Sequence, residues 1–72
     1  MYELNQEIAR RCFASLILDY EITQADINES GFYGFIPHVT CRVLIDGYYH
    51  STFTAANRAA AIEKFNNTEW RF

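Results

Sequence analysis

Near the start of the chain, apolar residues recur at helical spacing. The stripe consists of Leu4, Ile8, Cys12 and Leu16, and it is widened by Ala9 and Phe13. Acidic residues come early in this stretch and basic residues late, an order that suits the dipole of a helix. The pattern predicts a first helix over residues 2–15.

From residue 14 onward the period of the apolar positions changes to two. Apolar side chains alternate with mostly polar ones at Ala14, Leu16, Leu18, Tyr20 and Ile22. This alternation predicts a strand with one face on a core. Because no glycine or proline separates the two patterns, only the change of period marks the boundary, and we place it near residue 15.

The segment 24–37, QADINESGFYGFIP, holds two of the three glycines and the only proline of the chain. Glycine and proline are typical of turns and loops, so this segment is expected to be the long loop of the protein. A loop of this length is more often functional than a mere connection.

A hairpin is expected around Asp46 and Gly47. Apolar residues alternate through Val39, Cys41, Val43 and Ile45 before it, and through Tyr49, Ser51 and Phe53 after it. A two-residue turn would put these two sets on opposite faces, whereas a loop of odd length would pair Val43 with Tyr49 and align them. We therefore expect a three-residue turn with Gly47 in a left-handed conformation, a bulge, and Tyr49 in the core.

Thr54 is the expected N-cap of a second, alanine-rich helix that runs to about Asn66. Its inward residues are expected to be Ala59, Ile62 and Phe65. In the tail, residues 67–72, Trp70 and Phe72 either form a short extra strand or cover the core. The expected fold class is α+β. A single domain over residues 1–72 contains a helix, a three-stranded antiparallel sheet and a second helix, and a short C-terminal strand is the open alternative for the tail.

Composition indicates a folded chain with aromatic side chains to spare. Half of the 72 residues are hydrophobic and 17% are aromatic, too many for disorder and more than so small a core can hold. No stretch is long and apolar enough for a signal peptide or a membrane span. We therefore expect a cytoplasmic protein, without membrane contact, in which Cys12 and Cys41 are free thiols.

Metal or catalytic chemistry is not expected. His38 and Cys41, with His50 downstream and Cys12 upstream, suggest a zinc site, but residues 38 and 41 point to opposite faces of one strand, and Cys41 belongs to the apolar set. The same burial argues against a reactive cysteine. We expect no cofactor and no enzymatic activity.

Charge and aromatic residues point instead to docking on a protein. Between residues 13 and 37 there is no lysine or arginine, while the carboxylates are those of Asp19, Glu21, Asp26 and Glu29. The rings that follow them are Phe32, Tyr33 and Phe35. Carboxylates steer a basic partner and aromatic side chains anchor it. The alternative is a loop that folds back over the core. Tyr48 and His50, expected to be exposed at the hairpin, form a second candidate surface.

The order of helix, three strands and helix resembles a double-stranded RNA-binding domain. The residues that carry the likeness are 20–31, His38, and the stretch 42–65, RVLIDGYYHSTFTAANRAAAIEKF. That family holds phosphates with a lysine cluster at the start of its second helix, where this chain has Ala56, Asn57, Arg58 and Ala59. Nucleic acid is accordingly an unlikely partner.

In size, charge and lack of chemistry, the chain resembles small phage-encoded anti-defence proteins, such as anti-CRISPR proteins. The resemblance implies a non-enzymatic inhibitor that occupies a basic surface of a host nucleic-acid-binding complex, in the cytoplasm of the host cell. Two alternatives stay open. One is a degenerate RNA-binding domain, and the other is a dimerisation module whose homodimer interface contains Tyr48, Trp70 or Phe72.

Overall fold

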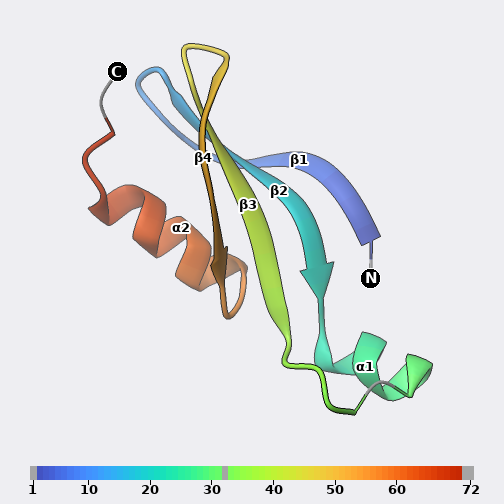
Figure 1. Ribbon diagram of the computed structural model, residues 1–72. Coiled ribbons are helices and arrows are strands. Elements are labelled where there is room, and N and C mark those ends of the chain that lie inside the picture. Colours follow the sequence, from blue (N-terminus) through green and yellow to red (C-terminus); the bar gives the residue numbers. More distant parts are fainter. Residues whose placement is uncertain (1, 32, 71–72) are drawn as a thin grey trace.

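The computed structural model describes residues 2–31 and 33–70, with side chains described from residue 5 onward. Its elements are β1 (Tyr2–Arg11), β2 (Ala14–Ile22), α1 (Gln24–Ser30), β3 (His38–Ile45), β4 (Tyr48–Ala55) and α2 (Arg58–Asn67). The strands form one four-stranded antiparallel sheet in the order β1-β2-β3-β4 (Figure 1). The fold is therefore α+β, but the expected helix, three strands and helix is wrong.

The N-terminal helix expected over residues 2–15 is a strand. Residues 2–11 pair with β2, for example Ala9 with Leu16, and two register shifts interrupt the pairing. A four-residue apolar spacing fits a helix, but it also fits a strand, because every fourth residue of a strand lies on one face. Asn5 and Cys12 adopt positive φ angles of 48° and 51°, so the chain bends without glycine. The absence of glycine and proline therefore hid a bulge and a hairpin turn.

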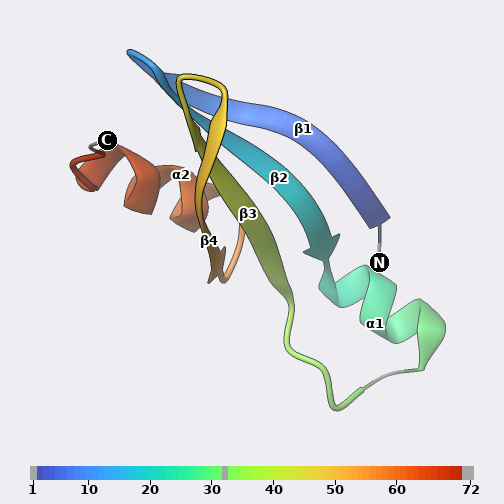
Figure 2. The same ribbon diagram turned by 45° about the horizontal axis from the view of Figure 1, so that its top comes forward.

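The segment 24–37 is not a loop throughout, because it begins with the short helix α1. Thr23 and Asp26 form a capping box at its start, and Gly31, with φ 79°, ends it in the left-handed conformation that glycine adopts without strain. Ile27 is the buried residue of this helix. Figure 2 shows α1 beyond the ends of β2 and β3, at the end of the molecule opposite the β3–β4 turn.

The β3–β4 hairpin has a two-residue turn instead of the expected three. Asp46 and Gly47 have φ angles of 54° and 85°, so the left-handed conformation expected of Gly47 is confirmed and Asp46 shares it. The faces are aligned by a bulge within β4: Leu44 pairs with Tyr49, but Val43 pairs with Ser51. Tyr49 consequently faces away from the core and is 65% exposed, contrary to expectation.

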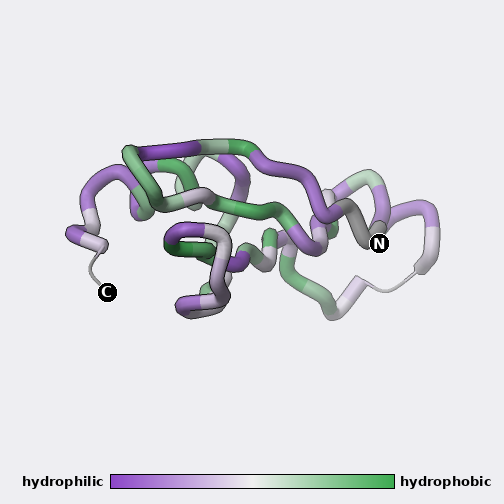
Figure 3. Tube along the Cα trace, turned by 90° about the horizontal axis from the view of Figure 1, so that it is seen from above, coloured by the Kyte–Doolittle hydropathy of each residue, from purple (hydrophilic) through white to green (hydrophobic). Residues whose placement is uncertain are grey.

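The core lies between one face of the sheet and α2. Its fully buried residues are Ala14, Leu16, Leu18, Val39, Cys41, Val43, Ile45, Ala61 and Phe65. Alternation in β2 and β3 supplies seven of them, which confirms that both segments are strands with an apolar face. Tyr20, expected on that face, lies on the opposite one and is 40% exposed, because a register shift follows Leu18. Figure 3 shows the contrast between these strands and β1, which is mostly hydrophilic.

The second helix is confirmed, but it begins after Thr54, which belongs to β4. Asn57 is the N-cap, and its side chain accepts a hydrogen bond of 2.8 Å from the backbone N–H of Ala60. Phe65 is buried and Ile62 half-buried as expected, whereas Ala59 is exposed.

The tail after α2 covers the core and forms no strand as far as residue 70. Trp70 packs against the core, and its indole Nε1 donates a hydrogen bond of 2.9 Å to the carbonyl of Phe65. Phe72 lies outside the described residues.

Arg11 joins the end of β1 to the end of α2. Its Nη1 donates to the carbonyl oxygens of Phe65, Asn66 and Thr68. The last carbonyls of a helix lack partners within the helix and carry its negative dipole end, so a guanidinium there is favourable. This contact fastens the helix that covers the core to the sheet.

We expect Arg11→Ala to lower the free energy of unfolding by about 1–2 kcal/mol, because three carbonyls lose a charged donor. Arg10→Ala is the matched control, since Arg10 is exposed and its ion pair with Glu7 lies within β1. Urea denaturation of both variants measures the effect. Equal destabilisation by the two substitutions would contradict the role of Arg11.

Candidate functional site

Two of the four acidic residues expected at a docking surface are held in ion pairs. The Asp19 carboxylate lies 2.8 Å from Nε of Arg42 in β3, and only 15% of the Asp19 side chain is exposed. The Glu21 carboxylate lies 2.8 Å from Nη2 of Arg58 in α2. Both arginines come from outside the acidic segment, so the negative charge of β2 is largely neutralised.

Asp26 has a structural task at the start of α1. Its carboxylate accepts hydrogen bonds of 3.0 Å from the backbone N–H and from the hydroxyl of Thr23. These two bonds, the backbone one first, lower the pKa of Asp26 below its usual value. Asp26 therefore stays ionised at neutral pH. Glu29, in the same helix, is exposed.

The described rings of the expected docking loop are exposed. Tyr33 is 74% exposed and Phe35 56%, and Ile36 beside them is 78% exposed. The loop therefore does not fold back over the core with these side chains. We call Tyr33, Phe35 and Ile36 the aromatic segment. Phe32, which the sequence placed in the same group, lies outside the described residues.

Tyr48 and His50 do not join the aromatic segment. They lie at the turn of the β3–β4 hairpin, at the opposite end of the molecule from α1 (Figure 1). Tyr48 is 77% exposed, as expected. His50 is also exposed, although the edge of its ring contacts Trp70 with centroids 5.5 Å apart. The residues singled out in the sequence thus form two separate surfaces.

One further surface was not anticipated, namely the face of the sheet opposite α2. Ile17 and Leu44 lie on this face; both are half-buried, and neither belongs to the core cluster. Tyr20 and Tyr49 lie on the same face and are 40% and 65% exposed. The Asp19–Arg42 ion pair lies among them, and Arg42 also donates to the side-chain oxygen of Asn5 at 2.8 Å. Ile17 and Leu44 could have revealed this surface, because they occupy the polar positions of the alternation.

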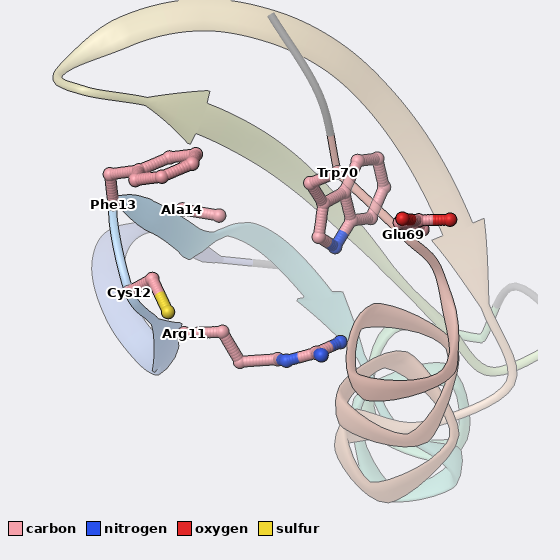
Figure 4. A pocket seen from close by; sticks show the side chains of 6 residues that line it. All are labelled: Arg11, Cys12, Phe13, Ala14, Glu69 and Trp70. Atoms are coloured by element: carbon pink, nitrogen blue, oxygen red, sulfur yellow. The ribbon is translucent and has the colours of Figure 1, made fainter.

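A shallow hollow lies between the β1–β2 turn and the segment after α2. Figure 4 shows its lining, which consists of Arg11, Cys12, Phe13, Ala14, Glu69 and Trp70. The walls are mostly apolar, and the hollow brings no histidine to the thiol of Cys12. Within the described part of the chain, no three His, Cys, Asp or Glu side chains gather to hold a metal ion.

Cys41, the other cysteine, is fully buried in β3. Burial, and to a lesser extent the negative charge of Asp19, raises the pKa of its thiol to about 11. The group is therefore a protonated thiol at neutral pH, which makes it a poor nucleophile and metal ligand.

Comparison of the chain with protein-family models, with curated proteins and with solved structures finds no match. None of the helices in the described part of the chain is both long and apolar enough to span a membrane.

The two cysteines should differ sharply in reactivity. We expect Ellman's reagent at pH 8 to label exposed Cys12 within minutes and Cys41 at least about a thousandfold more slowly, because Cys41 reacts only when the core opens. A Cys12→Ser variant isolates the slow reaction, and denaturant should make it fast. Rapid labelling of that variant under native conditions would show that the β3 core is not closed.

Asp26 should make stability depend on pH. Its pKa is lowered on folding, so its contribution is present above the unfolded pKa, near 3.8, and is lost as pH falls through the folded pKa. We expect the free energy of unfolding of Asp26→Asn to decline less than that of the wild type as pH falls from about 5 to 2. Thr23→Ala, which keeps only the backbone donor, should give an intermediate decline. Parallel declines in all three proteins would refute the capping role.

Proposed function

We infer that the protein is a non-enzymatic protein-binding module that docks through the aromatic segment and the adjoining helix α1. One observation carries this proposal: Tyr33, Phe35 and Ile36, within four residues of each other, are all more than half exposed. Large apolar side chains that gather on a small protein mark interaction sites more often than chance exposure does. Aromatic side chains are also the most frequent anchors of protein interfaces.

The buried core does not include these side chains. Its fully buried residues come from β2, β3 and α2, and α1 is anchored separately by Ile27. The segment is held at both ends, because the N–H of Gly31 donates to the carbonyl of Ile27 at 3.0 Å and β3 begins at His38. A short segment with fixed ends loses less conformational entropy on binding than a free one.

Charge favours a basic partner, though with fewer carboxylates than the sequence suggested. Asp26 and Glu29 lie in the helix directly before the aromatic segment, and the chain contains no lysine or arginine between residues 13 and 37. Asp19 and Glu21 add little, because arginines neutralise them. Steering by the remaining carboxylates would make association weaken with rising salt.

The narrower hypothesis, an inhibitor of a bacterial defence complex of the CRISPR type, stays a prediction based on size and charge. A dimerisation module stays one alternative, and RNA binding stays the other. The structure gives RNA binding no added support. Arg58, the cation expected at the start of α2, donates hydrogen bonds of 2.8 and 3.1 Å to Glu21.

The test compares two variants at opposite ends of the molecule. Wild-type protein is used to capture its partner from cells that carry its gene, and the dissociation constant is measured by calorimetry. We expect Tyr33→Ser with Phe35→Ser to weaken binding at least about tenfold, since two anchors of 1–2 kcal/mol each are lost. Tyr48→Ser is the matched control, equally exposed but at the other surface, and should bind as the wild type does.

Both variants should unfold within about 0.5 kcal/mol of the wild type, because the side chains are exposed. Unchanged affinity of the double variant, with loss of affinity in Tyr48→Ser, would move the docking surface to the hairpin. A titration with duplex RNA that shifts the NMR signals of His38 and Arg58 would favour the RNA-binding alternative.

A further inference from the structure

The two edge strands of the sheet differ in how they are protected against pairing with another strand. β1 contains four charged residues, and two register shifts break its ladder. β4, YYHSTFTA, has no charged residue, no proline and no glycine. Charged side chains and bulges are the usual devices that keep an edge strand from pairing, and β4 has only the bulge next to its turn. Among the described residues, β4 pairs on one side alone, with β3.

The part of β4 beyond the bulge is a regular strand with a natural centre. Residues 51–55 pair with β3 without interruption, and Phe53, opposite Cys41, is the middle of the five. Ser51, Phe53 and Ala55 lie on the face that α2 covers and are half-buried, whereas Thr52 and Thr54 lie on the opposite face and are exposed. A second strand added here would meet backbone groups, small or aromatic side chains and the ammonium group of Lys64 in α2, which lies 4.8 Å from the centre of the Phe53 ring.

We propose that β4 is the dimer interface of this protein, and that it pairs antiparallel with the β4 of a second copy around a two-fold axis at Phe53. The two four-stranded sheets then become one continuous sheet. In this register Phe53 meets the partner's Phe53, and Thr52 meets the partner's Thr54 on the exposed face. Aromatic pairs and threonine pairs are both favourable neighbours across antiparallel strands.

A second copy fits this edge better than an unrelated strand, for two reasons. The pairing is self-complementary, so that each side chain meets one of similar size and polarity, as a two-fold interface requires. In addition, β4 itself contains no charged residue, so two copies of this strand bring no like charges of their own together; the cation beside it is Lys64 of α2, over the Phe53 ring.

Tyr48 would add to the interface. It pairs with buried Ile45 and so lies on the α2 side of the sheet, where the same register brings its ring alongside the start of the partner's α2. The ring is 77% exposed, which at roughly 200 Å² per tyrosine amounts to about 150 Å², a fifth of the ~800 Å² that each partner of a stable complex buries. The proposal is independent of docking through the aromatic segment, which lies at the other end of the molecule.

Charged substitutions on the exposed face of β4 test both the interface and its register. Sedimentation equilibrium between about 1 μM and 1 mM, with reducing agent to exclude disulfides of Cys12, should show the wild type as a concentration-dependent dimer. Thr52→Lys with Thr54→Lys, and separately Thr52→Glu with Thr54→Glu, place like charges opposite each other across the axis. For each variant alone, the dissociation constant of the dimer should be at least about tenfold higher than that of the wild type.

An equimolar mixture of the two variants should restore the dimer, because each lysine then faces a glutamate of the other chain. The mixture also shows that both variants fold. Gln6→Lys is the control at the β1 edge and should dimerise as the wild type does. A monomeric wild type at 1 mM overturns the proposal, and so do variants that dimerise normally or a mixture that fails to associate.

Discussion

A single short helix provides the cover of the core. Within the described residues, α2 is the helix that packs on the sheet, and it contributes two fully buried side chains, Ala61 and Phe65. Trp70 extends this cover, with its ring 5.7 Å from that of Phe65. A helix of ten residues is about 15 Å long, whereas the molecule extends over 41 Å. One face of the sheet, and only part of its length, can therefore be sealed from water.

The exposed surfaces of the protein follow from this constraint. α1 lies beyond the end of the sheet, and in the segment after it Tyr33, Phe35 and Ile36 are each more than half exposed. The face opposite α2 keeps Tyr20 and Tyr49 exposed for the same reason. β4, which leads directly into α2, contributes half-buried side chains to the core, and among residues 2–31 and 33–70 no strand pairs with its outer edge. The exposure of the aromatic segment and that of the β4 edge thus have one cause, because α2 covers only part of the sheet.

Much of the core could be read from the sequence, because it depends on local periodicity. Alternation in β2 and β3 correctly gave both strands and the burial of Cys41, and the alanine-rich run gave the helix that carries Phe65. The prediction for β1 was wrong, because a four-residue apolar spacing suits a helix as well as a strand. The chain bends at Asn5 and Cys12, which adopt left-handed conformations although neither is glycine, so nothing in the sequence marked these bends. α1 was missed although Thr23 and Asp26 carry a capping signal, because the glycines that follow dominated the interpretation.

The ion pairs of the acidic residues could not be predicted from the sequence. The segment without lysine or arginine was identified correctly, but Asp19 meets Arg42 across 23 residues, and Glu21 meets Arg58 across 37. Such ion pairs depend on strand order and on the position of α2, and the order expected from the sequence contained one strand too few. The exposure of the aromatic segment was left open by the sequence, because a small core could have accepted one of its rings.

Solvent paramagnetic relaxation measured by NMR with a neutral soluble nitroxide tests most directly whether the core closes without the aromatic segment. We predict that the ring protons of Tyr33 and Phe35 relax as strongly as those of Tyr48, while the ring of Phe65 is protected. Protection of Tyr33 and Phe35 to the level of Phe65 would show that these rings belong to the core and would contradict the account.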